Sequence, residues 1–376
     1  MDTPGGDASA GVNLTVAVRC RPLSAEEQKK NVAKVVTTTG NKVVVTHAPG
    51  GSRTALERGY TYDKTHSAGL HVFESLASPV VDEVLLGYNC TIFAYGPTGT
   101  GKTHTMEGRG DGDDAGAGGR QTALKTLQIG IITRCAKAMF ERLERNKDAD
   151  FSVRVSCLEV YNEEMTDLLA CENLPGSKKL GVEAKREKRP LRLVAQEGKE
   201  SKGVVCANLD EPVCESMDEC LDFLRRGAAA RRVAATLCND KSSRSHAIYT
   251  LKVCVRSLAD DGRDLVVNGQ LNLVDLAGSE CVGRSGAKDV RAREAGNINQ
   301  SLLTLGRVIT ALVTASGDSK YVPYRDSKLT RLLQESLGGR AKTTLIATVS
   351  PGRDAVEETL STLQYALRAR CALRRR

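Results

Sequence analysis

The sequence has no tryptophan, and only 4% of its 376 residues are aromatic. This scarcity argues against a surface that stacks the bases of single-stranded nucleic acid. No apolar run approaches the roughly 18 residues that a membrane-spanning helix needs. Residues 1–11 lack the apolar core of a signal peptide, and we expect them to be a disordered lead-in.

The twelve cysteines show no spacing that is typical of a metal site. No C-x-x-C pair is present, and Cys20, Cys157 and Cys254 lie inside apolar runs. A disulfide framework would be expected in a small secreted chain, not in one of this length. We therefore interpret the cysteines as buried free thiols in a reducing cytosol.

Positive charge is what the chain has in excess, with a formal net charge of +8. A charge of this sign indicates an acidic partner, which can be nucleic acid, anionic lipid or an acidic protein surface. Each basic cluster alone is also compatible with a solvated face. The two clusters are Lys178, Lys179, Lys185, Arg186, Lys188, Arg189 and Arg192, and Arg368, Arg370, Arg374, Arg375 and Arg376.

The stretch that organises the chain is a glycine-rich loop after the apolar run 90–94. It reads Gly96-Pro97-Thr98-Gly99-Thr100-Gly101-Lys102-Thr103, which is the G-x-x-x-x-G-K-T spacing of a phosphate-binding loop. Glycines let successive backbone N–H groups converge on phosphate oxygens. Lys102 is placed to reach the β- and γ-phosphates of a nucleoside triphosphate, and the hydroxyl of Thr103 is placed to ligate Mg²⁺.

A second motif follows the apolar strand predicted at 271–274. Asp275 and Gly278 form Asp-x-x-Gly, a pattern that many strand–turn junctions share. Opposite a phosphate-binding loop, however, such an aspartate can hold Mg²⁺ through its water shell, and the glycine N–H can sense the γ-phosphate. Together the two motifs predict a nucleoside triphosphatase.

Hydrophobic periodicity predicts alternating strands and helices along the chain. We expect loops at 108–121, which is rich in glycine and aspartate, and at 178–192. Strands are expected at 12–20, 43–46, 151–160, 191–207, 247–255, 271–275 and 344–349. Helices are expected around 132–143, at 216–226, 298–312 and 324–333, and from 354 onward, where Asp354 is the expected cap.

Four motifs in this order resemble a kinesin motor domain: Arg19-Cys20-Arg21-Pro22, GPTGTGKT at 96–103, NDKSSRSH at 239–246 and DLAGSE at 275–280. The resemblance covers 12–370. Segments 151–169 and 285–313 are similar to the kinesin-5 class of spindle motors. That class also carries a long loop at the position of the insertion that follows Gly108 in this chain.

The resemblance implies an α/β fold, a single P-loop NTPase-type motor domain with a central mixed, mostly parallel β-sheet and helices on both faces. It implies a lead-in at 1–11, a motor domain at 12–370 and the start of a truncated neck linker at 371–376. One departure from the family is Pro97, where most kinesins have glutamine. Proline removes one backbone N–H far from Lys102, so we expect nucleotide binding to survive.

The resemblance also assigns site residues. Arg19, Arg21 and Pro22 would flank the adenine, and the loop 96–103 with His104 would hold the phosphates of ATP or ADP. Asn239, Ser242, Ser243 and Arg244 would form switch I, and Asp275, Gly278 and Glu280 would form switch II.

Within these switches the implied roles differ. Ser243 would lie near Mg²⁺, together with Thr103 and, through water, Asp275. Ser242 would lie near the attacking water, and Arg244 and Glu280 would pair as a gate over the γ-phosphate. For His246 the resemblance implies no chemistry, and we interpret it as structural.

Microtubules are the implied partner, because tubulin is acidic. The implied contacts are basic side chains on loops and on two helices. They are Lys199, Lys202, Arg284, Lys288, Arg291, Arg293, Arg325, Lys328 and Arg331.

The function that follows is a microtubule-stimulated ATPase that produces force or movement, expected in the cytoplasm, on the cytoskeleton and in the mitotic spindle. No membrane or nucleic-acid partner is expected. The fragment is expected to be monomeric, and the full-length protein oligomeric through a coiled-coil stalk. The alternatives are a P-loop switch that acts on another acidic polymer such as nucleic acid, a GTPase, or a binder that no longer hydrolyses. The Asn-Lys-x-Asp pattern of guanine-binding relatives is missing, which argues against a GTPase.

Overall fold

A computed structural model describes residues 14–47, 56–67, 69–108, 129–170, 190–195, 203–237, 241–258, 262–280, 290–314, 321–339 and 341–373. The predictions for 1–11, 109–121 and 178–189 lie outside these residues, as do Asn239, Lys199, Lys202, Arg284 and Lys288.

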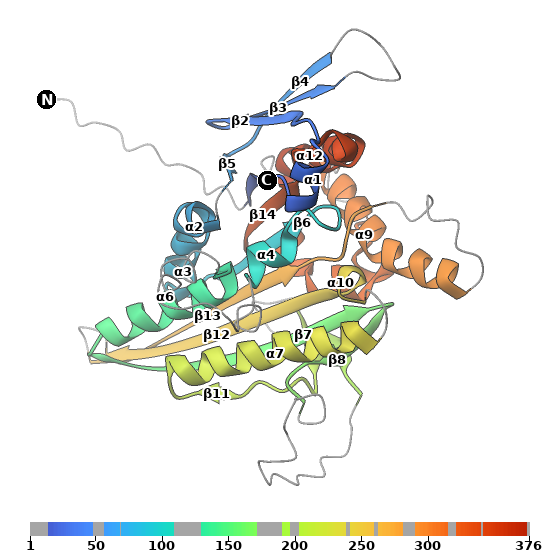
Figure 1. Cartoon of the computed structure of the whole chain (residues 1–376). Helices are drawn as coiled ribbons and strands as arrows, with labels where there is room; N and C mark the ends of the chain where they lie inside the picture. The colour runs from blue at the N-terminus through green and yellow to red at the C-terminus, as the bar shows by residue number, and fades with distance from the viewer. Residues whose placement is uncertain are drawn as a thin grey trace, which may run out of the picture.

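A central sheet crosses the molecule from one edge to the other (Figure 1). Its strand order is β11-β7-β12-β13-β6-β14-β1-β5, with β8 paired to β7. The bounds are β1 Leu14–Cys20, β5 Lys64–His66, β6 Asn89–Tyr95, β7 Ala149–Tyr161, β8 Glu164–Asp167, β11 Val213–Cys214, β12 His246–Leu258, β13 Asp264–Asp275 and β14 Lys342–Val349.

The strands from β13 through β6, β14 and β1 to β5 are parallel, and β12, β7 and β11 continue the sheet in antiparallel pairs. Parallel strands carry apolar side chains on both faces because helices cover both. Accordingly, Ile92 and Phe93 point to opposite faces of β6 and are both buried. The predicted mixed α/β sheet is confirmed.

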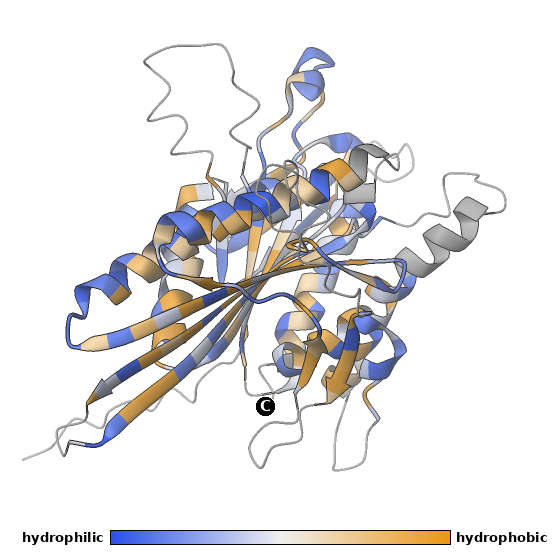
Figure 2. Cartoon of the chain, turned by 90° about the horizontal axis from the view of Figure 1, so that it is seen from below, coloured by the Kyte–Doolittle hydropathy of each residue, from blue (hydrophilic) through white to orange (hydrophobic). Residues whose placement is uncertain are grey.

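Helices cover both faces of this sheet. One face packs against α3 (Ser78–Leu85), α6 (Ile131–Arg145) and α7 (Met217–Leu237), whose buried side chains include Met139 and Leu224. The other face packs against α9 (Val290–Thr314), α10 (Lys328–Leu332), α11 (Gln334–Gly338) and α12 (Val356–Leu373). Figure 2 shows hydrophobic residues gathered where helices and sheet face each other. None of the described helices is long and apolar enough to cross a membrane.

Short elements complete the fold. The helical ones are α1 (Ala25–Lys29), α2 (Gly69–Val72) with a π-helical turn at Phe73–Ala77, α4 (Lys102–Met106), α8 (Lys241–Arg244), and 3₁₀ turns at Tyr324–Asp326 and Arg353–Ala355. A small sheet, β2 (Val36–Thr39), β3 (Lys42–His47) and β4 (Leu56–Thr61), projects from the body (Figure 1). A hairpin joins β9 (Arg192–Ala195) to β10 (Val204–Ala207).

Two predicted helices begin differently from the prediction. The helix expected at 324–333 is split, because Ser327 is extended and its hydroxyl accepts a hydrogen bond from the N–H of Leu329 (3.2 Å), which starts α10 afresh. The last helix begins at Val356, after a 3₁₀ turn that contains Asp354, and is helical to Leu373. At α7 the Ser216 hydroxyl caps the helix, since it accepts from the N–H of Glu219 (3.2 Å).

Gly269 lets β13 lie directly against the end of α3. A Cβ added there would lie 1.9 Å from the carbonyl oxygen of Val84, a backbone atom that cannot step aside. We expect Gly269→Ala to cost about 1–3 kcal/mol and to lower the thermal midpoint by several degrees. The matched control is Gly59→Ala in β4, where nothing lies within 4 Å of the added Cβ. Equal midpoints for the two variants would contradict this packing.

Candidate active site

The phosphate-binding loop connects β6 to α4. Three of its glycines have positive φ: Gly96 (154°), Gly99 (79°) and Gly101 (97°). At Gly96 a Cβ would also meet the carbonyl oxygen of Thr348 at 2.3 Å. The glycine spacing read from the sequence is therefore a conformational requirement of this loop.

The ammonium group of Lys102 turns back onto its own loop. Its Nζ donates to the carbonyls of Gly96 (2.9 Å) and Pro97 (3.0 Å), and the side chain is 7% exposed. Burial lowers the pKa of Lys102, while the carboxylates of Asp275 and Glu280 act in the opposite direction. A buried cation held only by neutral carbonyls is ready to exchange them for an anion.

Pro97 takes part in this loop through its carbonyl. That oxygen accepts from Lys102 and from the Thr100 hydroxyl (2.7 Å), so the loop closes without an N–H at position 97. The expectation that position 97 lies far from Lys102 is wrong, because the Pro97 carbonyl accepts from Lys102 Nζ (3.0 Å). That nucleotide binding survives this proline stays a prediction.

A buried carboxylate lies directly opposite the loop. Asp275 at the end of β13 is 0% exposed, and its Oδ2 accepts from the hydroxyl of Thr103 (2.7 Å) and from Nη1 of Arg231 (2.6 Å). The same Nη1 contacts Oε1 of Glu107 (3.0 Å), to which the hydroxyl of Tyr249 also donates (2.8 Å). Burial acts to lower the pKa of Arg231, but the two carboxylates outweigh it and raise that pKa.

Thr103 and Asp275 offer the oxygen ligands that Mg²⁺ prefers. Oδ1 of Asp275 is buried and has no hydrogen-bond partner among the described residues, so the carboxylate retains a free lone pair beside Thr103. In that part of the chain no three His, Cys, Asp or Glu side chains are grouped to hold a metal. The residues thus fit a magnesium ion whose shell nucleotide oxygens and water complete.

The loop and both switch segments are joined by hydrogen bonds. The N–H of Gly278 donates to the carbonyl of Ser243 (2.8 Å), and the N–H of Ser279 donates to the carbonyl of Gly96 (3.1 Å). The carboxylate of Glu280 accepts from the N–H (2.8 Å) and the hydroxyl (2.5 Å) of Thr98. A Cβ at residue 278 would lie 2.4 Å from the hydroxyl oxygen of Thr98, so a larger residue would displace the Thr98 and Glu280 side chains.

Arg244 is exposed in α8, and the predicted Arg244–Glu280 gate stays a prediction for the nucleotide-bound state. The side chain of Ser242 lies outside the described residues.

The arginines of the first motif support the loop from the side of β1. Arg19 is 4% exposed and donates to Gly101 O (3.2 Å) and Thr105 Oγ1 (2.6 Å), while its Nη2 lies 3.4 Å from His104 Nδ1. Arg21 Nε donates to the carbonyl of Gly99 (2.8 Å). Their role beside adenine stays a prediction, as does that of Pro22.

Arg21 is itself held in place by Glu27. Two hydrogen bonds join its guanidinium to that carboxylate (2.6 and 2.7 Å).

Sequence reasoning missed Arg231, Glu107 and Tyr249, which form a chain of contacts that ends at Asp275. Arg231 lies in the stretch GAAARRVAA of α7 and is 3% exposed. An arginine among small residues on a helix that packs on the sheet was the one available signal, but nothing local points to its partner 44 residues away.

The predicted basic contacts are only partly described. Arg325, Lys328 and Arg331 lie on the 3₁₀ turn and α10, which pack against α9, and each is exposed or partly exposed. Arg291 and Arg293 belong to the first part of α9, where only the backbone is described.

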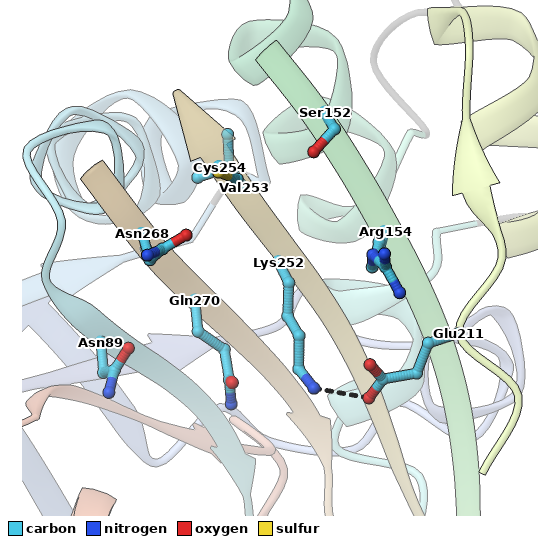
Figure 3. Close-up of a pocket in the computed structure, with 10 residues that line it drawn as sticks. Asn89, Ser152, Arg154, Glu211, Lys252, Val253, Cys254, Asn268 and Gln270 are labelled. Carbon is cyan, nitrogen blue, oxygen red and sulfur yellow. Dashed lines mark hydrogen bonds and ion pairs between the residues drawn. The ribbon is translucent and has the colours of Figure 1, made fainter. Parts of the chain in front are cut away.

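A separate hollow of about 340 Å³ is lined by residues of β6, β7, β12 and β13 (Figure 3). Its one dashed contact joins Lys252 Nζ to Glu211 Oε1 (2.5 Å), so this lysine is already neutralised. The hollow shares no lining residue with the loop and is not part of the nucleotide site.

Residues 19–371 match the family described as the kinesin motor domain. The chain belongs to the kinesin family. It is 47% identical over 369 residues to Kinesin-like protein KIN-5C of Oryza sativa subsp. japonica, covering 97% of this chain and 35% of that protein. It is 46% identical to Kinesin-like protein KIF11 of Mus musculus, covering 96% of this chain and 32% of that protein. The chain thus spans about a third of the length of the curated relatives it matches.

The fold is similar to that of a solved structure described as a fast kinesin. The TM-score is 0.80 at 36% identity, with 97% of this chain and 93% of that chain covered. The predicted kinesin motor domain and its similarity to kinesin-5 proteins are confirmed. A match to a kinesin motor domain implies nucleotide binding, as predicted.

Arg231 provides a test of the buried charge cluster. We expect Arg231→Met to cost about 3–5 kcal/mol, because it keeps the volume but leaves the carboxylates of Asp275 and Glu107 buried without their cation. Thermal unfolding measures this loss. The control on the same helix is Arg226→Met, which breaks an i,i+4 surface pair with Asp222 worth about 0.3–0.5 kcal/mol. Similar losses in both variants would show that the Arg231 cluster adds nothing beyond a surface pair.

Proposed function

We propose that this chain is a microtubule-stimulated ATPase that converts ATP hydrolysis into force or movement along microtubules, within a longer protein of the mitotic spindle. The observation that carries the proposal is the direct bonding of three segments around one site: Gly278 to Ser243, and Glu280 to Thr98 of the phosphate-binding loop. A change at the γ-phosphate position must move both switches, because each is bonded there.

The similar solved structure is described in terms of ATPase mechanism and of interactions with microtubules, which supports the same partner for this chain. The relatives named KIN-5 and KIF11 support association with the cytoskeleton and the spindle.

In this mechanism Lys102 exchanges the carbonyls of Gly96 and Pro97 for oxygens of the β- and γ-phosphates. Thr103 and Ser243 would hold Mg²⁺, with Asp275 acting through water; when bound, the ion neutralises charge on the phosphate oxygens. Arg231 holds the Asp275 carboxylate in its orientation, since their contact is 2.6 Å and buried.

The hydrolytic water is positioned by switch residues. Ser242 orients it toward the γ-phosphorus, while the N–H of Gly278 exchanges the Ser243 carbonyl for an oxygen of the γ-phosphate. Glu280 leaves Thr98, pairs with Arg244 and accepts the water's proton, directly or through a second water. Positioning and charge stabilisation supply most of the rate in such a transfer, so a strong base is not required.

Docking on the microtubule uses the basic residues of the 3₁₀ turn and α10, with those predicted on the loops and on α9. Each exposed pair with acidic tubulin is weak and screened by salt. Together they steer the encounter and set its rate.

Glu280→Ala tests the gate. We expect ATP binding to be retained and hydrolysis to fall by about 10²–10⁴-fold, the usual contribution of a proton-accepting group. A fluorescent ATP analogue measures binding, and single-turnover cleavage measures hydrolysis. Glu141→Ala, an exposed change on α6, is the control. Turnover near that of the control would remove Glu280 from the mechanism.

The basic surface is tested by steady-state ATPase with polymerised tubulin, at low and moderate salt. For Arg325→Glu, Lys328→Glu and Arg331→Glu combined, we expect the microtubule concentration at half-maximal rate to rise at least about tenfold, with a weaker dependence on salt. Arg145→Glu, exposed on α6 and so on the other face, is the control. If the unmodified chain hydrolyses ATP without stimulation, the microtubule is the wrong partner, and nucleic acid is tested in its place.

A further inference from the structure

His246, the first residue of β12, makes two hydrogen bonds that point to different parts of the molecule. Its Nδ1 accepts from the backbone N–H of Ala277 (3.0 Å), and its Nε2 lies 2.8 Å from the hydroxyl oxygen of Ser301. Because Nδ1 accepts, the proton of the neutral ring is on Nε2, which donates to Ser301.

The ring stays neutral in this place. Burial, and then the charges of Arg231 and Lys102, lower the pKa of His246 to about 3. The side chain is 2% exposed, and Ser301 is 3% exposed. Both hydrogen bonds are therefore shielded from bulk solvent.

The two hydrogen-bond partners of His246, Ala277 and Ser301, lie on elements with different proposed functions. Ala277 lies between Asp275 and Gly278, so its N–H belongs to the backbone that bonds to switch I. Ser301 lies in α9, which packs against α10 and the 3₁₀ turn that carry the basic surface. One rigid imidazole therefore joins the segment that senses the γ-phosphate to the helix behind the microtubule-binding side.

We propose that His246 is a positioning residue that couples switch II to α9, through Ala277 on one side and Ser301 on the other. This rests on the proposed function, and adds a named link to it. A shift of Ala277 when ATP closes the site must either drag the ring and α9 along or break a buried hydrogen bond. Coupling of this kind between two sites usually amounts to about 5–150-fold.

A matched pair of variants on α9 separates coupling from packing. Ser301→Ala removes the far end of the link. Thr304→Ala removes a hydroxyl that is also buried (0% exposed) but whose oxygen has no hydrogen-bond partner among the described residues. We expect Ser301→Ala to keep basal ATPase within about twofold and to reduce microtubule stimulation at least fivefold. Thr304→Ala should keep both.

His246→Asn adds a second measurement. The shorter amide can still accept from Ala277 but cannot reach Ser301, so its loss of stimulation should equal that of Ser301→Ala. The double variant should be no worse than either single one, because both break one link. Losses that multiply in the double variant would overturn the proposal.

A measurement without microtubules separates the coupling through His246 from the proposal that the partner is a microtubule. Hydrogen exchange of backbone amides at 301–312 is compared with and without a non-hydrolysable ATP analogue. We expect a nucleotide-dependent change in the unmodified chain and in Thr304→Ala, and its loss in Ser301→Ala. If Ser301→Ala responds like the unmodified chain, the link is absent, whatever the partner. If exchange behaves as expected but microtubules do not stimulate, the coupling stands and the proposed partner fails.

Discussion

The nucleotide site depends on an anion that has been taken out of water. Asp275 is fully buried at the end of β13, and its charge is tolerated because Arg231 and the Thr103 hydroxyl bond to the same oxygen. Burying a carboxylate without partners is costly, so the contacts of Asp275 with Arg231 and Thr103 are what make this position possible. The Arg231–Asp275 ion pair therefore places a carboxylate beneath the phosphate-binding loop, whose lysine, Lys102, bonds to carbonyls of the same loop.

In that arrangement the phosphate-binding loop has several hydrogen-bond donors but contributes no negatively charged acceptor. Among the described residues, Lys102 donates to neutral carbonyls, and the N–H of Thr98 donates to Glu280. A triphosphate offers better acceptors for both donors. The same exchange frees Glu280, so binding and rearrangement of switch II are one event rather than two. Because His246 bonds to the neighbouring Ala277, we propose that a movement of switch II is transmitted through His246 to α9.

The sequence predicted those parts of this site that are local. Residues 90–103 specify a strand, a glycine-dependent loop and a lysine within one segment, and the structure places them as expected. Arg231, Glu107 and Tyr249 could not be predicted in this way, because they meet only when α4, α7, β12 and β13 are packed. The strand β4 was missed for the opposite reason: its side chains are mostly exposed, so no alternation marks it, and pairing with β3 alone defines it. The contact of Glu280 with Thr98 depends on the state of the site, which no sequence pattern encodes.

The cluster around Asp275 also has a consequence for how the chain folds. Glu107, Arg231 and Asp275 are far apart in the sequence, yet each is nearly buried against the others. A nascent chain that ends before Asp275 would hold Arg231 with one of its two carboxylates missing, at a position that admits little water. The first two thirds of the chain are thus a poor independent folding unit, and the two halves of the sheet become stable together. Contacts over such long sequence separations are slow to form, so this domain should fold late and all at once during synthesis.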